Sequence, residues 1–103
     1  MKRGNDSQEY AFSAKVWIYS GAGGWHFVTL PKKLAAEIQF FHSGLQKNFG
    51  SIAVTASIGH TSWKTSLFRD SKSASYLLPL KADVRKKEKI MANQKLHVRL
   101  TIG

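Results

Sequence analysis

The residues best suited to chemistry lie in one run of the chain, from Trp63 to Arg85. Small polar and cationic side chains stand there among large apolar ones, where a strand should be half buried. Because buried polar groups need partners, these side chains either bind one another or hold a ligand. The ligand hypothesis places an anion among Trp63, as a stacking plate, the small polar Thr65 and Ser66, and the cations Lys81 and Arg85. We refer to these five residues as the Trp63–Arg85 set.

The cations at the end of this run have the spacing of one helix face. Lys81, Arg85 and Lys89 recur every four residues, and like charges at this spacing repel one another unless an anion joins them. The alternative is structural: Arg85 would bind carbonyl groups inside the fold, while Thr65 and Ser66 would satisfy backbone groups. The sequence leaves both interpretations open.

Other kinds of site chemistry have little support in the sequence. The chain has no cysteine, which excludes disulfides, thiolate catalysis and cysteine-ligated zinc. Its four histidines are scattered without a close-spaced pair, and its six acidic residues show no paired-carboxylate arrangement. The sequence therefore favours a protein that is not an enzyme, and we assign no catalytic residue, metal or cofactor.

The chain is strongly basic, and its charge is uneven. The formal net charge is +10, and residues 61–103 hold ten lysines and arginines against three acidic residues. Such a surface attracts polyanions, and the affinity falls as salt rises because each neutralised phosphate releases counterions. A basic surface can also serve only to keep a small protein soluble. Beside Lys81 and Arg85, the expected basic contact surface comprises Lys64, Arg69, Lys86 and Lys87.

Alternating hydrophobicity predicts that strands position most of these residues. Phe12, Ala14, Val16 and Ile18 repeat with the period of a strand that buries one face, and the glycine-rich residues 21–24 turn the chain into a second strand. The expected strands are two within residues 10–30, then 52–58, 63–68, 76–78 and 96–102. This pattern predicts a mainly β domain of six strands.

Two short helices are expected between the strands. Pro31 suits the first position of a helix, where its missing N–H is not needed, and Leu34, Ile38 and Phe41 recur at the spacing of one apolar face. The helices are expected over residues 31–43 and 81–89. The order is strand, strand, helix, strand, strand, strand, helix, strand.

The length and composition fit one compact domain. With 103 residues, 43% of them hydrophobic, we expect a flexible tail over residues 1–9 and a single domain over residues 10–103. No segment approaches the roughly 20 apolar residues of a membrane span, so the expectation is a cytoplasmic, bacterial-type protein without a membrane partner.

A weak internal repeat lies within this order. F-V-T-L-P-K-K-L at residues 27–34 and Y-L-L-P-L-K-A at residues 76–82 each run from an aromatic residue, through a short strand and a proline, to a helix. Two such units predict a barrel built from pseudo-two-fold halves.

Four segments of the chain together resemble the bacterial family DUF1905, a domain of unknown function. They are W-H-F-V-T-L-P at 25–31, F-G-S-I-A-V at 49–54, W-K-T-S-L-F at 63–68 and Y-L-L-P-L-K-A-D-V-R at 76–85. The resemblance covers roughly residues 10–102. It implies a small double-split β-barrel, a class that also holds dimeric bacterial regulators and antitoxins that bind DNA. It implies no activity.

The chain departs from that family's usual pattern at two places. Arg69 stands where the family usually has proline, which adds a cation and frees a backbone donor. Ala92, Asn93 and Gln94 stand where the family usually has Gly-Asp, before the last strand. Asn93 can still adopt a left-handed turn at low cost, so we expect the fold to survive.

Three functions are consistent with these residues. The first is a non-enzymatic binding module that recognises an anionic ligand or nucleic acid through the basic C-terminal half. The second is a small-molecule pocket or minor enzyme centred on the Trp63–Arg85 set. The third is a structural or homodimeric interaction domain, in which Trp17 and Tyr19 on the nominally polar strand face supply the contact.

Overall fold

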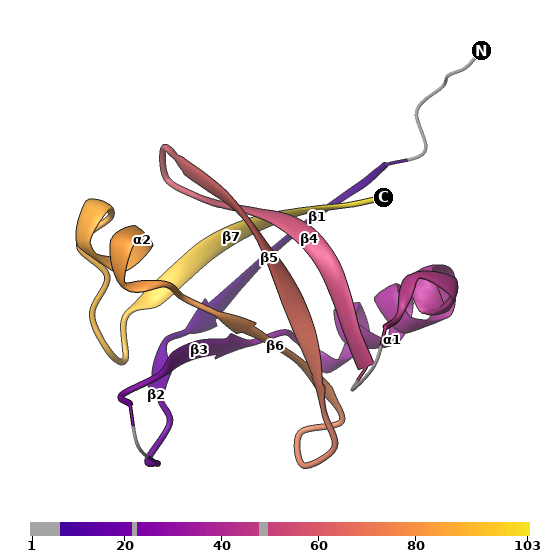
Figure 1. Ribbon diagram of the computed structural model, residues 1–103, viewed down its shortest axis with the longest axis horizontal. Coiled ribbons are helices and arrows are strands. Elements are labelled where there is room, and N and C mark those ends of the chain that lie inside the picture. The colour runs from indigo at the N-terminus through magenta and orange to yellow at the C-terminus, as the bar shows by residue number, and fades with distance from the viewer. Residues whose placement is uncertain (1–6, 22, 48–49) are drawn as a thin grey trace.

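One strongly curled antiparallel sheet makes up most of the protein (Figure 1). The computed structural model describes residues 7–21, 23–47 and 50–103. Seven strands lie in the order β1-β7-β4-β5-β6-β3-β2. They are β1 (Gln8–Lys15), β2 (Trp17–Ile18), β3 (His26–Thr29), β4 (Ser51–Ile58), β5 (Thr61–Asp70), β6 (Ser75–Pro79) and β7 (Lys95–Ile102). The sheet forms a half-barrel, so the predicted mainly β, barrel-like architecture is confirmed.

Apolar side chains fill the inner face of the half-barrel. On β4, Ile52, Val54, Ala56 and Ile58 are all buried, as their alternation predicts. The buried residues of β7 are Leu96, Val98, Leu100 and Ile102. Burying each valine, leucine or isoleucine contributes roughly 1.5–3 kcal/mol, so this shared core holds the sheet in its curled form.

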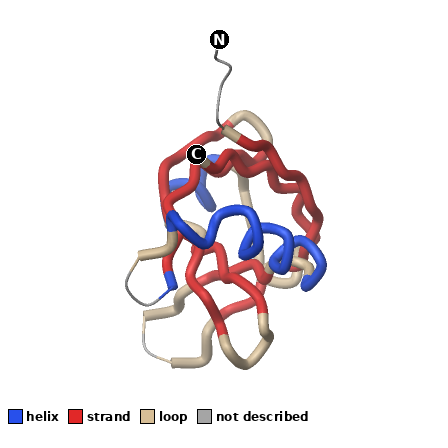
Figure 2. Tube along the Cα trace, turned by 90° about the vertical axis from the view of Figure 1, so that its right-hand side faces the viewer, coloured by secondary structure: helices blue, strands red, loops and turns tan. Residues whose placement is uncertain are grey.

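The helices lie at opposite ends of the half-barrel. They are α1 (Lys32–His42), which continues into the 3-10 turn η1 (Ser43–Leu45), and α2 (Ala82–Lys87). Figure 1 shows α1 at one end and α2 at the other, and Figure 2 shows a helix lying across the curled strands.

The first predicted strand is broken in two, so the sheet has seven strands and not the expected six. After Lys15, the backbone of Val16 exchanges hydrogen bonds with Gln94 and Asn93, in the loop before β7. The next residues pair with β3 instead. Ile18, which the alternation placed on the inner face, is 47% exposed. That expectation was wrong because the break at Val16 moves the chain from one neighbour to another.

The residues that precede β1 and β7 are those expected to form the flexible tail and the left-handed turn. β1 begins at Gln8, so the folded domain starts before the expected boundary at residue 10. The rest of the expected tail, residues 1–6, lies outside the described residues. Asn93 has a φ of 69°, which confirms the left-handed turn expected before β7.

Helix α1 has Pro31 at its N-cap and not at its first position as expected, and of the three predicted apolar positions Leu34 and Ile38 pack on the core while Phe41 does not. Its buried residues are Ala35, Ile38 and His42. Phe41, predicted to face the core, is 66% exposed. The inward position at this end of the helix belongs to His42, because its Nε2 lies 2.9 Å from the Tyr10 hydroxyl of β1, in a hydrogen bond.

Helix α2 is shorter than expected. It ends at Lys87 because Lys89 adopts a φ of 54°, and the Ile90 N–H then donates to the Arg85 carbonyl at 2.9 Å. Left-handed residues commonly end helices in this way. The predicted helical line of three cations was therefore wrong for Lys89, which lies beyond the helix.

The two copies of the internal repeat lie in neighbouring strands. β3 and β6 are antiparallel. Backbone hydrogen bonds close the pair at both ends, from Leu30 N–H to the Tyr76 carbonyl (3.0 Å) and from Leu80 N–H to the His26 carbonyl (2.9 Å). α1 follows β3 and α2 follows β6, which places the helices at opposite ends of this strand pair (Figure 1).

We expect Ser75→Ala to destabilise the fold, because this buried hydroxyl ties β6 to the end of β3. Ser75 Oγ donates to the Leu30 carbonyl at 2.6 Å, and both residues are buried. Removing the donor should cost about 1–3 kcal/mol, or ~4–8 °C of melting temperature per kcal/mol. Thermal melts followed by circular dichroism would measure this. The exposed Ser13→Ala is the control, and equal melting temperatures for the two variants would contradict the expectation.

Candidate functional site

The pleat of β5 separates Ser66 from Trp63 and Thr65 within the Trp63–Arg85 set. β5 pairs with β4 so that Thr65 lies opposite the buried Val54, and Ser66 opposite the exposed Ala53. Successive side chains of a strand point to opposite faces. Thr65 and Trp63 therefore face the inside of the half-barrel, whereas Ser66 faces outward. The set does not line a single surface.

The cations of the set have different environments. Arg85 is half buried on α2, and its Nε donates to the Leu80 carbonyl at 3.1 Å, which is the structural alternative expected for it. Lys81 is exposed at the N-cap of the same helix. On the inner face, Trp63 Nε1 is buried and has no hydrogen-bond partner among the described residues. A small-ligand role for this part of the set stays a prediction.

The expected basic contact surface is likewise divided. Lys64 is exposed and faces outward on β5, while Lys86 and Lys87 are exposed in the last turn of α2. Arg69 is half buried, and its guanidinium carbon lies 5.2 Å from the centre of the Tyr76 ring. Burial raises the pKa of that tyrosine, and the nearby arginine partly opposes the rise. Arg69 is thus held in a cation–π contact.

A different site stands out on the outer face of the sheet. The register aligns Phe68 of β5 with Leu77 of β6, and Phe27 of β3 with Trp17 of β2, so outward-facing apolar side chains from four strands meet there. They line a groove with a volume of about 870 Å³. Its lining residues are Trp17, Ile18, Tyr19, Ser20, Trp25, Phe27, Phe68, Asp70, Ser71, Lys72 and Leu77. We call this the aromatic groove.

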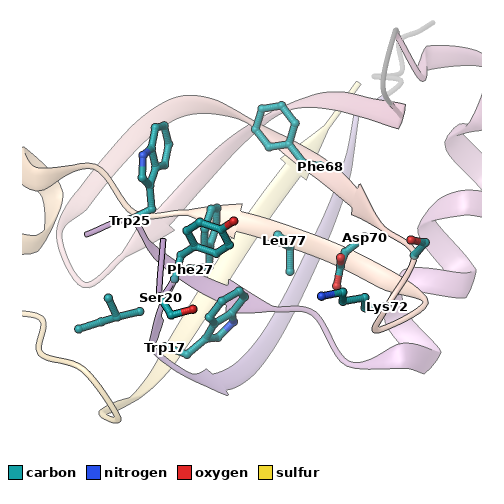
Figure 3. A pocket seen from close by; sticks show the side chains of 11 residues that line it. Trp17, Ser20, Trp25, Phe27, Phe68, Asp70, Lys72 and Leu77 are labelled. Atoms are coloured by element: carbon teal, nitrogen blue, oxygen red, sulfur yellow. The ribbon is translucent and has the colours of Figure 1, made fainter. Parts of the chain in front are cut away.

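The rings of the aromatic groove are partly stacked and partly fixed. Phe27 lies between two tryptophans. Its ring centroid is 6.1 Å from that of Trp25, with the ring planes 13° apart, and 5.2 Å from that of Trp17, with the ring planes 35° apart. Trp17 Nε1 donates to Thr29 Oγ1 at 2.9 Å, which holds the indole in place. Trp25 is 57% exposed. Figure 3 shows Trp17 of β2, Phe27 of β3 and Trp25, just before β3, gathered together, with Leu77 of β6 and Phe68 of β5 farther along the groove.

The polar end of the groove is formed by the turn between β5 and β6. Asp70 and Lys72 lie there together, away from Trp25 (Figure 3). The Ser73 hydroxyl donates to Asp70 Oδ2 at 2.6 Å, and the Ser73 N–H donates to the same oxygen at 3.1 Å. The hydroxyl bond holds the pKa of Asp70 below its ordinary value, so this carboxylate stays ionised at neutral pH.

Sequence reasoning found only part of this groove. Trp17 and Tyr19 were singled out as contact aromatics, and both line it. Trp25, Phe27 and Phe68 were assigned to strands without a role. The available signal was that Phe27 and Phe68 stand beside buried residues and so must face outward. The cross-strand register that brings them together was not readable from the chain.

The chain belongs to the family described as Domain of unknown function (DUF1905), whose model matches residues 12–100. This confirms the resemblance inferred from the four segments. No curated protein matches the chain. Within residues 7–21, 23–47 and 50–103, no three His, Asp or Glu side chains lie close enough to hold a metal ion, and no helix has the length and apolar character needed to cross a bilayer.

Proposed function

We propose that this protein is a non-enzymatic module that binds single-stranded nucleic acid. Bases would stack in the aromatic groove, and nearby cations would hold the phosphates. The observation that carries the proposal is the groove itself, about 870 Å³ faced by aromatic rings, on a chain of net charge +10. Base–aromatic stacking contributes roughly 1–3 kcal/mol per base, and every base has a face that can stack.

The groove is suited to stacking because its rings are already placed. The hydrogen bond from Trp17 to Thr29 and the contacts of Phe27 with both tryptophans orient the ring faces before any ligand binds. Less side-chain entropy is then lost on binding. An exposed aromatic surface of this kind on a small domain usually marks an interaction site.

Charge complementarity favours a polyanion as the occupant. Lys72 lines the groove, and Lys64 lies on the same outward face of β5 as Phe68, four residues away. At about 3.3 Å per strand residue, Lys64 is roughly 13 Å from Phe68, which is within reach of the next phosphates of a bound strand. Within the groove lining Asp70 offsets the charge of Lys72, so the excess of positive charge comes from residues outside the lining, Lys64 among them.

Tryptophan fluorescence would test this proposal. Trp17 and Trp25 line the groove, whereas Trp63 faces the inside of the half-barrel. At low salt, a short oligothymidylate should quench the two groove tryptophans and shift their emission. The same sequence in a duplex should quench less, because its base faces are stacked away. Emission that is unchanged by single strands would contradict the proposal.

We also propose that the fold is a double-split barrel and that the protein is cytoplasmic, as the sequence predicts. The neighbouring β3 and β6, each leading into a helix, support a double-split barrel with pseudo-two-fold halves. A cytoplasmic location would supply single-stranded RNA and DNA.

A second copy of the chain is the competing occupant of the groove. Light scattering that shows a dimer, and a monomer after Trp25→Ala, would favour that occupant over nucleic acid.

A further inference from the structure

The polar end of the aromatic groove contains one fixed acceptor. Both hydrogen bonds from Ser73 to Asp70 end on Oδ2, and the backbone N–H of Lys72 also stabilises this carboxylate, so its orientation is set before a ligand binds. Figure 3 shows Asp70 at the end of the groove, next to Lys72. An ionised carboxylate has about four lone-pair sites on its two oxygens, so Asp70 can still accept from a ligand. The groove therefore offers a stacking surface and, at one end, an oriented acceptor.

A carboxylate is an unexpected lining group for a site that binds a polyanion. It repels phosphates, so the group that approaches it should instead carry N–H donors. Guanine is the standard base with two adjacent N–H donors, N1–H and N2–H, on its Watson–Crick edge. Adenine and cytosine place a ring-nitrogen acceptor beside the amine, and uracil and thymine flank their N3–H with two carbonyls. A carboxylate accepts from guanine and opposes the acceptors of the others.

We propose that Asp70 makes the aromatic groove selective for guanine. The base lies against the aromatic rings and donates N1–H and N2–H to the Asp70 carboxylate, while Lys72 faces the adjoining phosphate. This inference rests on the proposed function, and it adds what stacking alone does not supply, because stacking accepts every base. The low pKa of Asp70 keeps the acceptor charged at neutral pH.

The test uses wild-type protein and oligothymidylates that carry one central guanine, hypoxanthine or adenine. Hypoxanthine keeps N1–H but lacks the N2 amine. We expect the guanine strand to bind about tenfold more tightly than the adenine strand, the size of one charge-assisted contact to a base. The hypoxanthine strand should fall between them. Asp70→Asn should remove the preference, and Asp83→Asn, which neutralises an exposed acid on α2, should retain it.

The outcomes separate this inference from the function on which it rests. Equal affinity for all three strands would overturn the guanine selectivity and leave single-strand binding standing. If no strand binds and guanosine monophosphate leaves the fluorescence unchanged, both the guanine selectivity and the single-strand function are overturned. A response to that nucleotide and none to adenosine monophosphate would support the guanine site and overturn the single-strand function. The hypoxanthine strand needs no mutation, so the selectivity is testable even if Asp70→Asn does not fold.

Discussion

Replacing Trp25 with alanine should weaken the binding of single-stranded oligonucleotides by about tenfold to a hundredfold, the effect of losing one base–aromatic stack. Trp25 is 57% exposed and lies in the groove parallel to Phe27, so it presents a free ring face. Its backbone carbonyl accepts from Tyr19 N–H at 2.8 Å, and alanine keeps that bond. Anisotropy of a labelled oligonucleotide measures the affinity without depending on tryptophan emission.

The matched control is Phe40→Ala on α1. Phe40 is an exposed aromatic residue, at 78%, and it is not among the residues that line the groove. Its removal should change the affinity less than twofold. Both variants should melt within a few degrees of the wild type, because surface substitutions away from packed features alter stability by about 0.5 kcal/mol or less. Equal losses of affinity in the two variants would mean that the groove is not the site.

Local patterns predicted most of the elements because each strand has its own signal. Ile52 to Ile58 and Leu96 to Ile102 alternate without interruption, and both strands are found with the predicted face inward. The prediction failed where a distant residue decides the outcome. Val16 breaks the first strand through bonds to the loop at residues 93–94, and Tyr10 draws His42 inward in place of Phe41. Such contacts are set by the tertiary fold, and hydrophobic period alone does not encode them.

The candidate site was harder to predict than the fold for the same reason. The Trp63–Arg85 set is contiguous in sequence, yet the pleat of β5 sends Thr65 and Ser66 to opposite faces. The aromatic groove draws instead on four strands and two loops, and Phe68 meets Leu77 only through the β5–β6 register. Register follows from the packing of the whole sheet. The basic charge was readable from composition, while the surface that would use it was not.

The affinity for single strands should fall about a hundredfold between 50 and 200 mM salt, if roughly five phosphates are neutralised, because the slope of log affinity against log salt is about −0.7 per phosphate for single strands. The net charge of +10 and the exposed Lys64 and Lys72 make a contact of this size reasonable. Anisotropy titrations at four or more salt concentrations would give the slope. A slope near zero would show that stacking acts without phosphate contacts, against the proposed role of the cations.

A pair of double variants locates the phosphates. Lys64→Gln with Lys72→Gln should make the slope shallower by about 1.4, since two contacts of about 0.7 each are lost. Lys86→Gln with Lys87→Gln removes the same charge from the end of α2, where both lysines are exposed and outside the groove lining. That pair should leave the slope nearly unchanged. Because the two variants have equal net charge, a larger change in the α2 pair cannot be a general field effect. Such a result would indicate that the bound phosphates lie against α2 and not along the outer face of β5.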